Sequence, residues 1–156
     1  LLFWGLLAGA GCRLLGQPPN PRPNVLILLA DDLGFGDLGC YGNRTAGPPV
    51  IQTPSLDKLA RQALRFTNAH SSAPVCSPSR AGLLTGRIPT RLGIHDWIPD
   101  HDGIHLTAAE TTLATVLGRV GYQTAFFGKW HLSGEFNSAL QPRPNDHGFA
   151  YWLGTH

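Results

Sequence analysis

The chain of 156 residues has no methionine, few charged residues and only three cysteines. Charged residues make up 14% of it and hydrophobic residues 42%, whereas about 25% charged is usual in soluble domains. Disordered chains combine low hydrophobicity with high net charge, so this composition excludes that class. The 19 Gly and 13 Pro follow no period, which excludes a collagen-like chain. A net charge of +2 gives no reason to expect a nucleic-acid or membrane-surface partner; the composition is that of a globular protein.

The start of the sequence predicts export and a longer protein. No initiating methionine is present, and the chain opens inside the apolar run LLFWGLLAGA, which resembles the core of a secretory signal peptide. We therefore expect a signal at 1–16, a linker at 17–23 and an incomplete domain at 24–156, in a periplasmic or secreted protein. A truncated N-terminal membrane anchor is the alternative, and a lipoprotein attached through Cys12 is a weaker one.

Short apolar runs alternate with helical patterns along the rest of the chain. The expected strands are 24–30, 64–67 and 122–127, and the expected helices begin at Thr53, Ser77 and Thr107. Thr107 and Glu110 have the spacing of a capping box, and Gly86 is placed to end the second helix. Residues 86–107 resemble a loop. Strand and helix in alternation are typical of an α/β fold with a mainly parallel sheet.

Residues capable of chemistry follow each expected strand. Asp31 and Asp32 come directly after the first strand, Cys76 lies beyond the second, and Lys129 and His131 follow the third. In open α/β sheets the ligand crevice lies outside the carboxyl ends of the strands. The topology therefore predicts that these side chains meet at one edge of the sheet.

Adjacent carboxylates such as Asp31 and Asp32 disfavour joint ionisation unless a cation neutralises them. Their oxygens suit a hard ion such as Ca²⁺ or Mg²⁺. A solvated surface turn is the alternative for this pair.

Cys76 stands at the entry to the expected helix, where free N–H groups and the helix dipole favour an anion. Arg80 follows one turn later and is able to reach an oxyanion there. A buried structural cysteine, or a disulfide with Cys40 in an oxidising compartment, is the alternative.

In an extended chain Lys129 and His131 would face the same side. A thiol hydrolase using Cys76 and His131 is another reading, but no thiol-enzyme signature accompanies it.

Four motifs in order resemble the N-terminal half of a type I sulfatase, a member of the arylsulfatase family. They are PNVLILLADDLGFGDLGCYG, TPSLDKLA, RFTNAHSSAPVCSPSRAGLLTGR and GYQTAFFGKWHL. The resemblance covers about Pro23 to His156, and C-x-P-x-R followed by AGLLTG is its most specific part. It implies an alkaline-phosphatase-like α/β/α sandwich with a mainly parallel sheet, of which this chain is the N-terminal part.

The resemblance also implies roles for single residues. A formylglycine-generating enzyme would oxidise Cys76 to Cα-formylglycine, whose hydrate attacks the sulfur of a sulfate ester. Asp31, Asp32 and residue 76 would bind one Ca²⁺ ion. Arg80 would anchor the hydrate and Lys129 the sulfate, while His131 would form a hydrogen bond to the hydrate.

The resemblance places further metal ligands, another His and another Lys beyond His156, so we expect the 156 residues alone to be inactive. Two other functions remain open from the sequence. One is a phosphodiesterase or phosphonate hydrolase with the same fold and nucleophile, and the other is a degenerate, non-catalytic sulfatase homologue.

Overall fold

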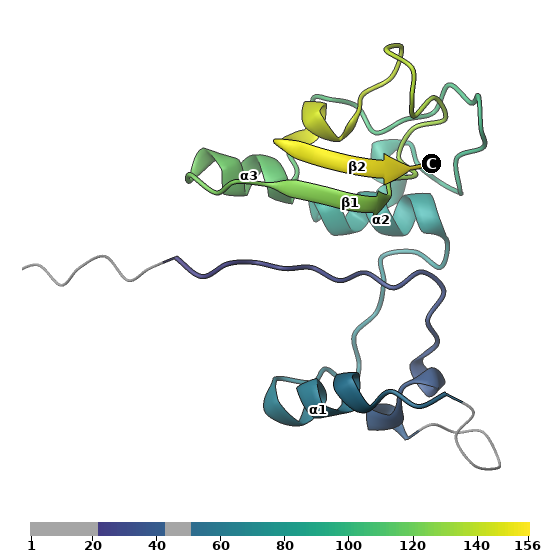
Figure 1. Ribbon diagram of the computed structural model, residues 1–156. Helices are drawn as coiled ribbons and strands as arrows, with labels where there is room; N and C mark the ends of the chain where they lie inside the picture. The colour runs from purple at the N-terminus through teal and green to yellow at the C-terminus, as the bar shows by residue number, and fades with distance from the viewer. Residues whose placement is uncertain (1–21, 43–50) are drawn as a thin grey trace, which may run out of the picture. The chain divides into compact units, whose positions relative to one another are not determined.

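The computed structural model describes residues 22–42 and 51–156 (Figure 1). The predicted signal at 1–16, Cys12 and most of the predicted linker lie outside these residues. The chain divides into two units, residues 1–30 and residues 31–156. All the helices and strands of the described residues belong to the second unit.

Short helices and two strands make up the second unit. In chain order they are the 3-10 helices η1 (Phe35–Asp37) and η2 (Gly39–Tyr41), α1 (Pro54–Gln62), α2 (Cys76–Thr85), the 3-10 helix η3 (Pro89–Leu92), α3 (Leu113–Arg119), β1 (Ala125–Lys129), the 3-10 helix η4 (Pro144–His147) and β2 (Tyr151–Thr155). The strands β1 and β2 run parallel, with Ala125 beside Tyr151 and Lys129 beside Thr155; Figure 1 shows them side by side. Helices and a small parallel sheet are what the predicted α/β class requires.

Two of the three predicted strands are absent from the described residues, and one strand was not predicted. Residues 24–30 and 64–67 form no ladder, because an apolar run becomes a strand only where another backbone pairs with it. In the second run Leu64 is 81% exposed. The third predicted strand is confirmed as β1, which starts three residues later than expected. The sequence pattern gave no sign that β2 would pair with it.

The helix starts agree with the sequence to different degrees. Pro54 occupies the first turn of α1, as predicted. Helix α2 begins at Cys76 and not at Ser77, and it ends at Gly86, whose φ of 65° is the left-handed conformation expected of a terminating glycine.

The predicted capping box at Thr107 and Glu110 is wrong. The hydrogen bond between their backbones closes a turn, and the Glu110 carboxylate pairs with Arg87 instead. The cap of α3 lies five residues after Thr107, at Thr112, whose hydroxyl accepts the N–H of Thr115 at 3.2 Å. The chemistry of the cap was as expected, but a different threonine provides it.

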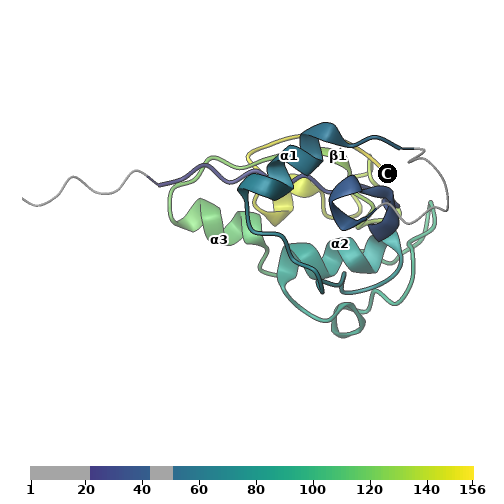
Figure 2. The same ribbon diagram turned by 90° about the horizontal axis from the view of Figure 1, so that it is seen from below.

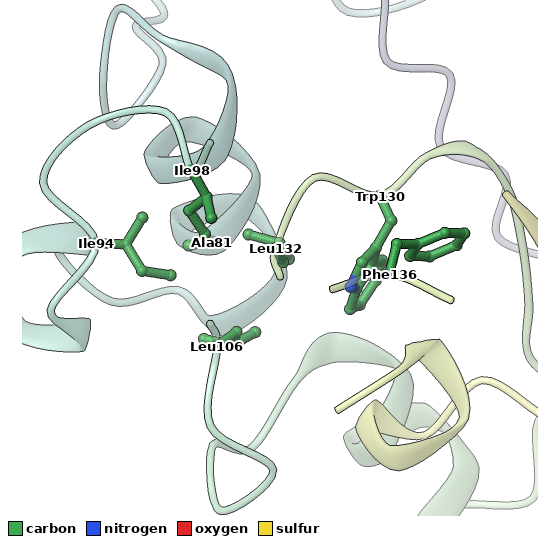
Figure 3. Close-up of a cluster of buried hydrophobic side chains, with 7 residues drawn as sticks. All are labelled: Ala81, Ile94, Ile98, Leu106, Trp130, Leu132 and Phe136. Carbon is green, nitrogen blue, oxygen red and sulfur yellow. The ribbon is translucent and has the colours of Figure 1, made fainter. Parts of the chain in front are cut away.

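Figure 3 shows the side chains of the hydrophobic core, among them Trp130, which directly follows β1 in the chain. The buried members of this core are Ala81, Ile94, Ile98, Leu106, Trp130, Leu132 and Phe136. Ile94 and Ile98 come from the predicted loop 86–107, which Figure 2 draws mainly as coil between α2 and α3. This loop is thus a structural part of the core and is not merely a surface segment.

Two further findings concern membranes and disulfides. Within the described residues no helix has both the length and the apolar character needed to cross a bilayer. Cys40 and Cys76 are both free thiols, so the disulfide considered from the sequence is not present.

Candidate functional site

Three of the predicted site residues are in direct contact. Asp31 accepts a hydrogen bond from Arg80 Nη2 on one carboxylate oxygen and from Lys129 Nζ on the other, each at 3.1 Å. These residues are 49 and 98 positions apart in the sequence. The prediction that the ends of the strand-like segments converge is confirmed for this part of the site, although residues 24–30 form no strand.

Arg80 is held in place more firmly than its two partners. Its side chain is only 10% exposed, against 33% for Lys129 and 48% for Asp31. A second fork nitrogen, Nη1, donates to the Lys129 carbonyl oxygen at 2.7 Å. The N–H on Nε is buried and has no hydrogen-bond partner in the described part of the chain. A firmly held guanidinium with unused donors, the buried Nε–H among them, is therefore present at the site.

The two cationic partners affect the acidity of Asp31. Its hydrogen bond to Lys129 holds the pKa of the carboxyl below its ordinary value, and Arg80 acts in the same direction, while partial burial opposes them. Asp31 is therefore an anion under neutral conditions.

Cys76 is the first residue of α2, with Arg80 one turn further along the same helix. Its side chain is partly buried, at the helix end where backbone N–H groups and the dipole favour negative charge. The sequence predicted this placement correctly. The Cys76 side chain makes no hydrogen bond or ion pair with the other predicted residues in the part of the chain that the structure describes.

Ser77 links the start of α2 to His131. The Ser77 side chain is fully buried, and its oxygen accepts the N–H of Ile98 at 3.0 Å. The carbonyl of the same Ile98 lies 3.0 Å from His131 Nε2. Because a carbonyl only accepts, Nε2 carries the proton and Nδ1 is left with a free lone pair.

His131 is buried, 7% exposed, and its Nδ1 has no partner among the residues described. Burial lowers the pKa of the imidazole, and the charges of His156, Lys129 and Arg80 lower it further, against a raising effect of the bond to Ile98. The ring is therefore neutral near pH 7, with an acceptor nitrogen. This state is suited to taking up a proton.

The backbone at His131 differs from what the sequence suggested. Strand β1 ends at Lys129, and His131 has a φ of 52°, in the left-handed region. The alternation of an extended chain therefore does not apply, and the two side chains do not face the same side as a strand pair. Lys129 reaches Asp31, whereas His131 turns into the core beside Ile98. Left-handed residues other than glycine are strained and often found at functional sites.

Asp32 shares this backbone feature but makes no ion pair or hydrogen bond with the described residues; its φ is 57°. In the described part of the chain no group of three or more His, Cys, Asp or Glu side chains is arranged to hold a metal ion. The pair Asp31 and Asp32 offers hard oxygen donors of the type that Ca²⁺ prefers. The cations gathered on Asp31 show that positive charge is favourable at this position, so the two residues fit part of a metal shell.

An open cavity of about 380 Å³ is lined in part by His156, whose ring packs against that of His131. Asp100, His101, Glu135 and His156 contribute to its lining. The His156 ring packs edge-on against the His131 ring with centroids 4.7 Å apart, and it pairs with Asp100 at 2.6 Å. On another side of His131, Trp97 is 53% exposed at a centroid distance of 6.5 Å.

Sequence reasoning missed Ser77, Ile98 and His156 as parts of the site. The pattern CSPSR suggested Ser77 as a helix cap, and nothing distinguished Ile98 from its apolar neighbours. Their roles depend on backbone groups brought together by folding, which a side-chain motif does not report. For His156 the only signal was its residue type.

Known proteins resemble this chain over nearly its whole length. The sulfatase family matches residues 23–156. Rat (Rattus norvegicus) steryl-sulfatase is 44% identical over 154 residues, which cover 91% of this chain and 25% of the relative. Bovine (Bos taurus) arylsulfatase A is 44% identical over 155 residues, covering 97% of this chain and 28% of the relative.

Solved structures show the same similarity. One, from a study of the metabolism of multiple glycosaminoglycans by Bacteroides thetaiotaomicron, superposes with a TM-score of 0.76 at 37% identity, covering 87% of this chain and 28% of the other. The fold is therefore the N-terminal α/β part of an alkaline-phosphatase-like sulfatase fold. The chain spans about a quarter of the length of the relatives it matches.

Proposed function

The chain belongs to the sulfatase family, and on this premise we propose that the complete protein hydrolyses a sulfate ester. The observation that carries the proposal is the contact of Arg80 and Lys129 with Asp31. Two cations and a carboxylate, with Arg80 one turn into α2, suit a site that receives a tetrahedral anion beside a divalent cation.

Cys76 is the proposed nucleophilic position and Asp31 and Asp32 the proposed metal ligands. Cys76 as formylglycine would supply a hydrated aldehyde as nucleophile, and Ca²⁺ would supply a Lewis acid that stabilises developing negative charge. The carboxylate oxygens of the two aspartates are the observation that supports this assignment, and further residues of the full protein would complete the shell.

Arg80 and Lys129 are proposed to hold the anionic groups. The unpaired Nε–H of Arg80 would be one of the donors available to oxygens at position 76. Lys129 is flexible and one-third exposed, so its ammonium is able to contact a sulfate oxygen. Both residues would stabilise charge as it develops in the transition state.

His131 is proposed to take up a proton at Nδ1. The bond from Nε2 to Ile98 fixes the tautomer, and burial keeps the ring neutral through a lowered pKa. A neutral, oriented imidazole is able to accept a hydrogen bond from a hydroxyl at position 76 and take its proton.

Maturation and export complete the proposal. A formylglycine-generating enzyme would act on Cys76, and the apolar start of the sequence would direct the protein out of the cytoplasm. The cavity beside His156 offers space for the organic part of the ester.

A phosphodiesterase or phosphonate hydrolase, and a degenerate homologue, are not favoured, because the family and the relatives described above are sulfatases. Turnover of an aryl sulfate and of the matching aryl phosphate by the full-length protein tests the choice. We expect the sulfate to be hydrolysed with the higher kcat/KM and a Cys76→Ala variant to hydrolyse neither. A preference for the phosphate, or equal activity of the variant, would overturn the proposal.

A further inference from the structure

Lys129 and the proposed metal require the same carboxylate. Both oxygens of Asp31 accept hydrogen bonds in this structure, one from Arg80 and one from Lys129. A metal ion bound to Asp31 needs at least one of these oxygens as a ligand. A divalent cation at this oxygen also repels the two cationic side chains, so the contact that is held less firmly is expected to break when the metal binds.

The two side chains are not equally able to move. Arg80 is nearly buried and is also held by its bond to the Lys129 carbonyl. The Lys129 ammonium has Asp31 as its only hydrogen-bond partner among the described residues, and its side chain is one-third exposed. A lysine stem is flexible and its ammonium is readily hydrated, so Lys129 is the contact that breaks.

We infer that Lys129 occupies the cation position at Asp31 before the metal binds and is released by the metal. The inference rests on the proposed function, which places the metal at Asp31 and Asp32. In the metal-free protein the ammonium neutralises Asp31 and keeps the carboxylate in position. Once displaced, it is free to contact the sulfate of the substrate, so that metal binding prepares the anion site.

Chemical labelling of Lys129 detects the release directly. The full-length protein is treated with an amine-acetylating reagent in calcium or in a chelator, and peptide mass spectrometry gives the labelling rate of each lysine. We expect calcium to raise the rate at Lys129 by about two- to fivefold, the size expected when a partly exposed ion pair is lost. Lys58, an exposed lysine of α1, is the internal control and should not change.

A calcium titration by calorimetry provides the second test. Lys129→Met removes the competing cation, so we expect calcium to bind about two- to fivefold more tightly, whereas Lys58→Met should leave the affinity unchanged. Loss of a nearby positive charge would also tighten binding without any displacement, which is why the labelling rate is measured too.

The outcomes separate this inference from the proposed function. If calcium does not bind the wild-type protein, the metal assignment and the inference are both wrong. If calcium binds but labelling of Lys129 stays the same or falls, or if Lys129→Met binds calcium more weakly, only the inference is wrong.

Discussion

Ser77 provides the sharpest test of how the site is held together. Its buried hydroxyl accepts the N–H of Ile98, whose carbonyl in turn orients His131. Replacement by alanine removes the acceptor and leaves a buried N–H without a partner. The second position of the C-x-P-x-R pattern is variable, so Ser77→Ala keeps the residues that define the motif.

The expected loss follows from burial. An unpaired buried donor costs about 1–3 kcal/mol, so Ser77→Ala should lower the free energy of unfolding by about that amount and Tm by a few degrees. Water reaching the loosened His131 ring should relieve the effect of burial and raise its lowered pKa. Since the neutral ring is the proposed proton acceptor, the acid limb of the kcat/KM profile should move to higher pH.

Ser79→Ala is the matched control, two residues further along α2. The Ser79 hydroxyl is partly buried and donates only to the Cys76 carbonyl within the same helix, at 2.9 Å. We expect its loss to cost about 0.5 kcal/mol or less and to leave the pH profile unchanged. Thermal unfolding and pH–rate profiles of both full-length variants give the comparison. Equal stability and equal profiles for the two variants would refute the role of Ser77.

Three further predictions concern other parts of the chain. Arg80→Lys keeps the charge but loses the fork that holds Asp31 and the Lys129 carbonyl, so kcat/KM for an aryl sulfate should fall about 100-fold; a fall below tenfold would contradict this. Burial lowers the pKa of both His131 and His147, so below the ordinary value of 6.5 the unfolded chain binds protons that the folded chain does not. The contribution of the two neutral rings to the free energy of unfolding should therefore be fully present above pH 6.5 and be lost as pH falls through the lowered pKa values. Urea midpoints measured across this range should decline less for His147→Phe than for the wild type. Thr112→Ala removes the cap of α3 and should lower the free energy of unfolding by about 1–2 kcal/mol, measured by denaturant titration; an unchanged midpoint would contradict the cap.

The sequence predicted features that depend on local chemistry. Pro54 at the start of α1 and Gly86 at the end of α2 act through their own backbone geometry, so their neighbours in the chain are enough to identify them. The same holds for Cys76 and Arg80, which are one helical turn apart. The contact of Arg80 and Lys129 with Asp31 was anticipated only as a convergence of strand ends.

Features that depend on distant partners were not predictable in this way. Strand β2 exists because it pairs with β1 over a gap of more than twenty residues, and no pattern within it names that partner. The apolar run 24–30 has the composition of a buried strand, yet its side chains are exposed. Thr107 has the spacing of a cap but Thr112 is the cap, since the helix begins where tertiary packing permits it. Such outcomes depend on which backbones meet after folding.

The side chain at position 76 decides whether the proposed nucleophile is present. The full-length protein, made in a host with formylglycine-generating machinery, yields a tryptic peptide from Phe66 to Arg80 that contains this position. Its mass reports the side chain, and a control sulfatase made in the same host reports whether the machinery is active. We predict an aldehyde at position 76. An unmodified cysteine there, with the control sulfatase converted, would contradict the account.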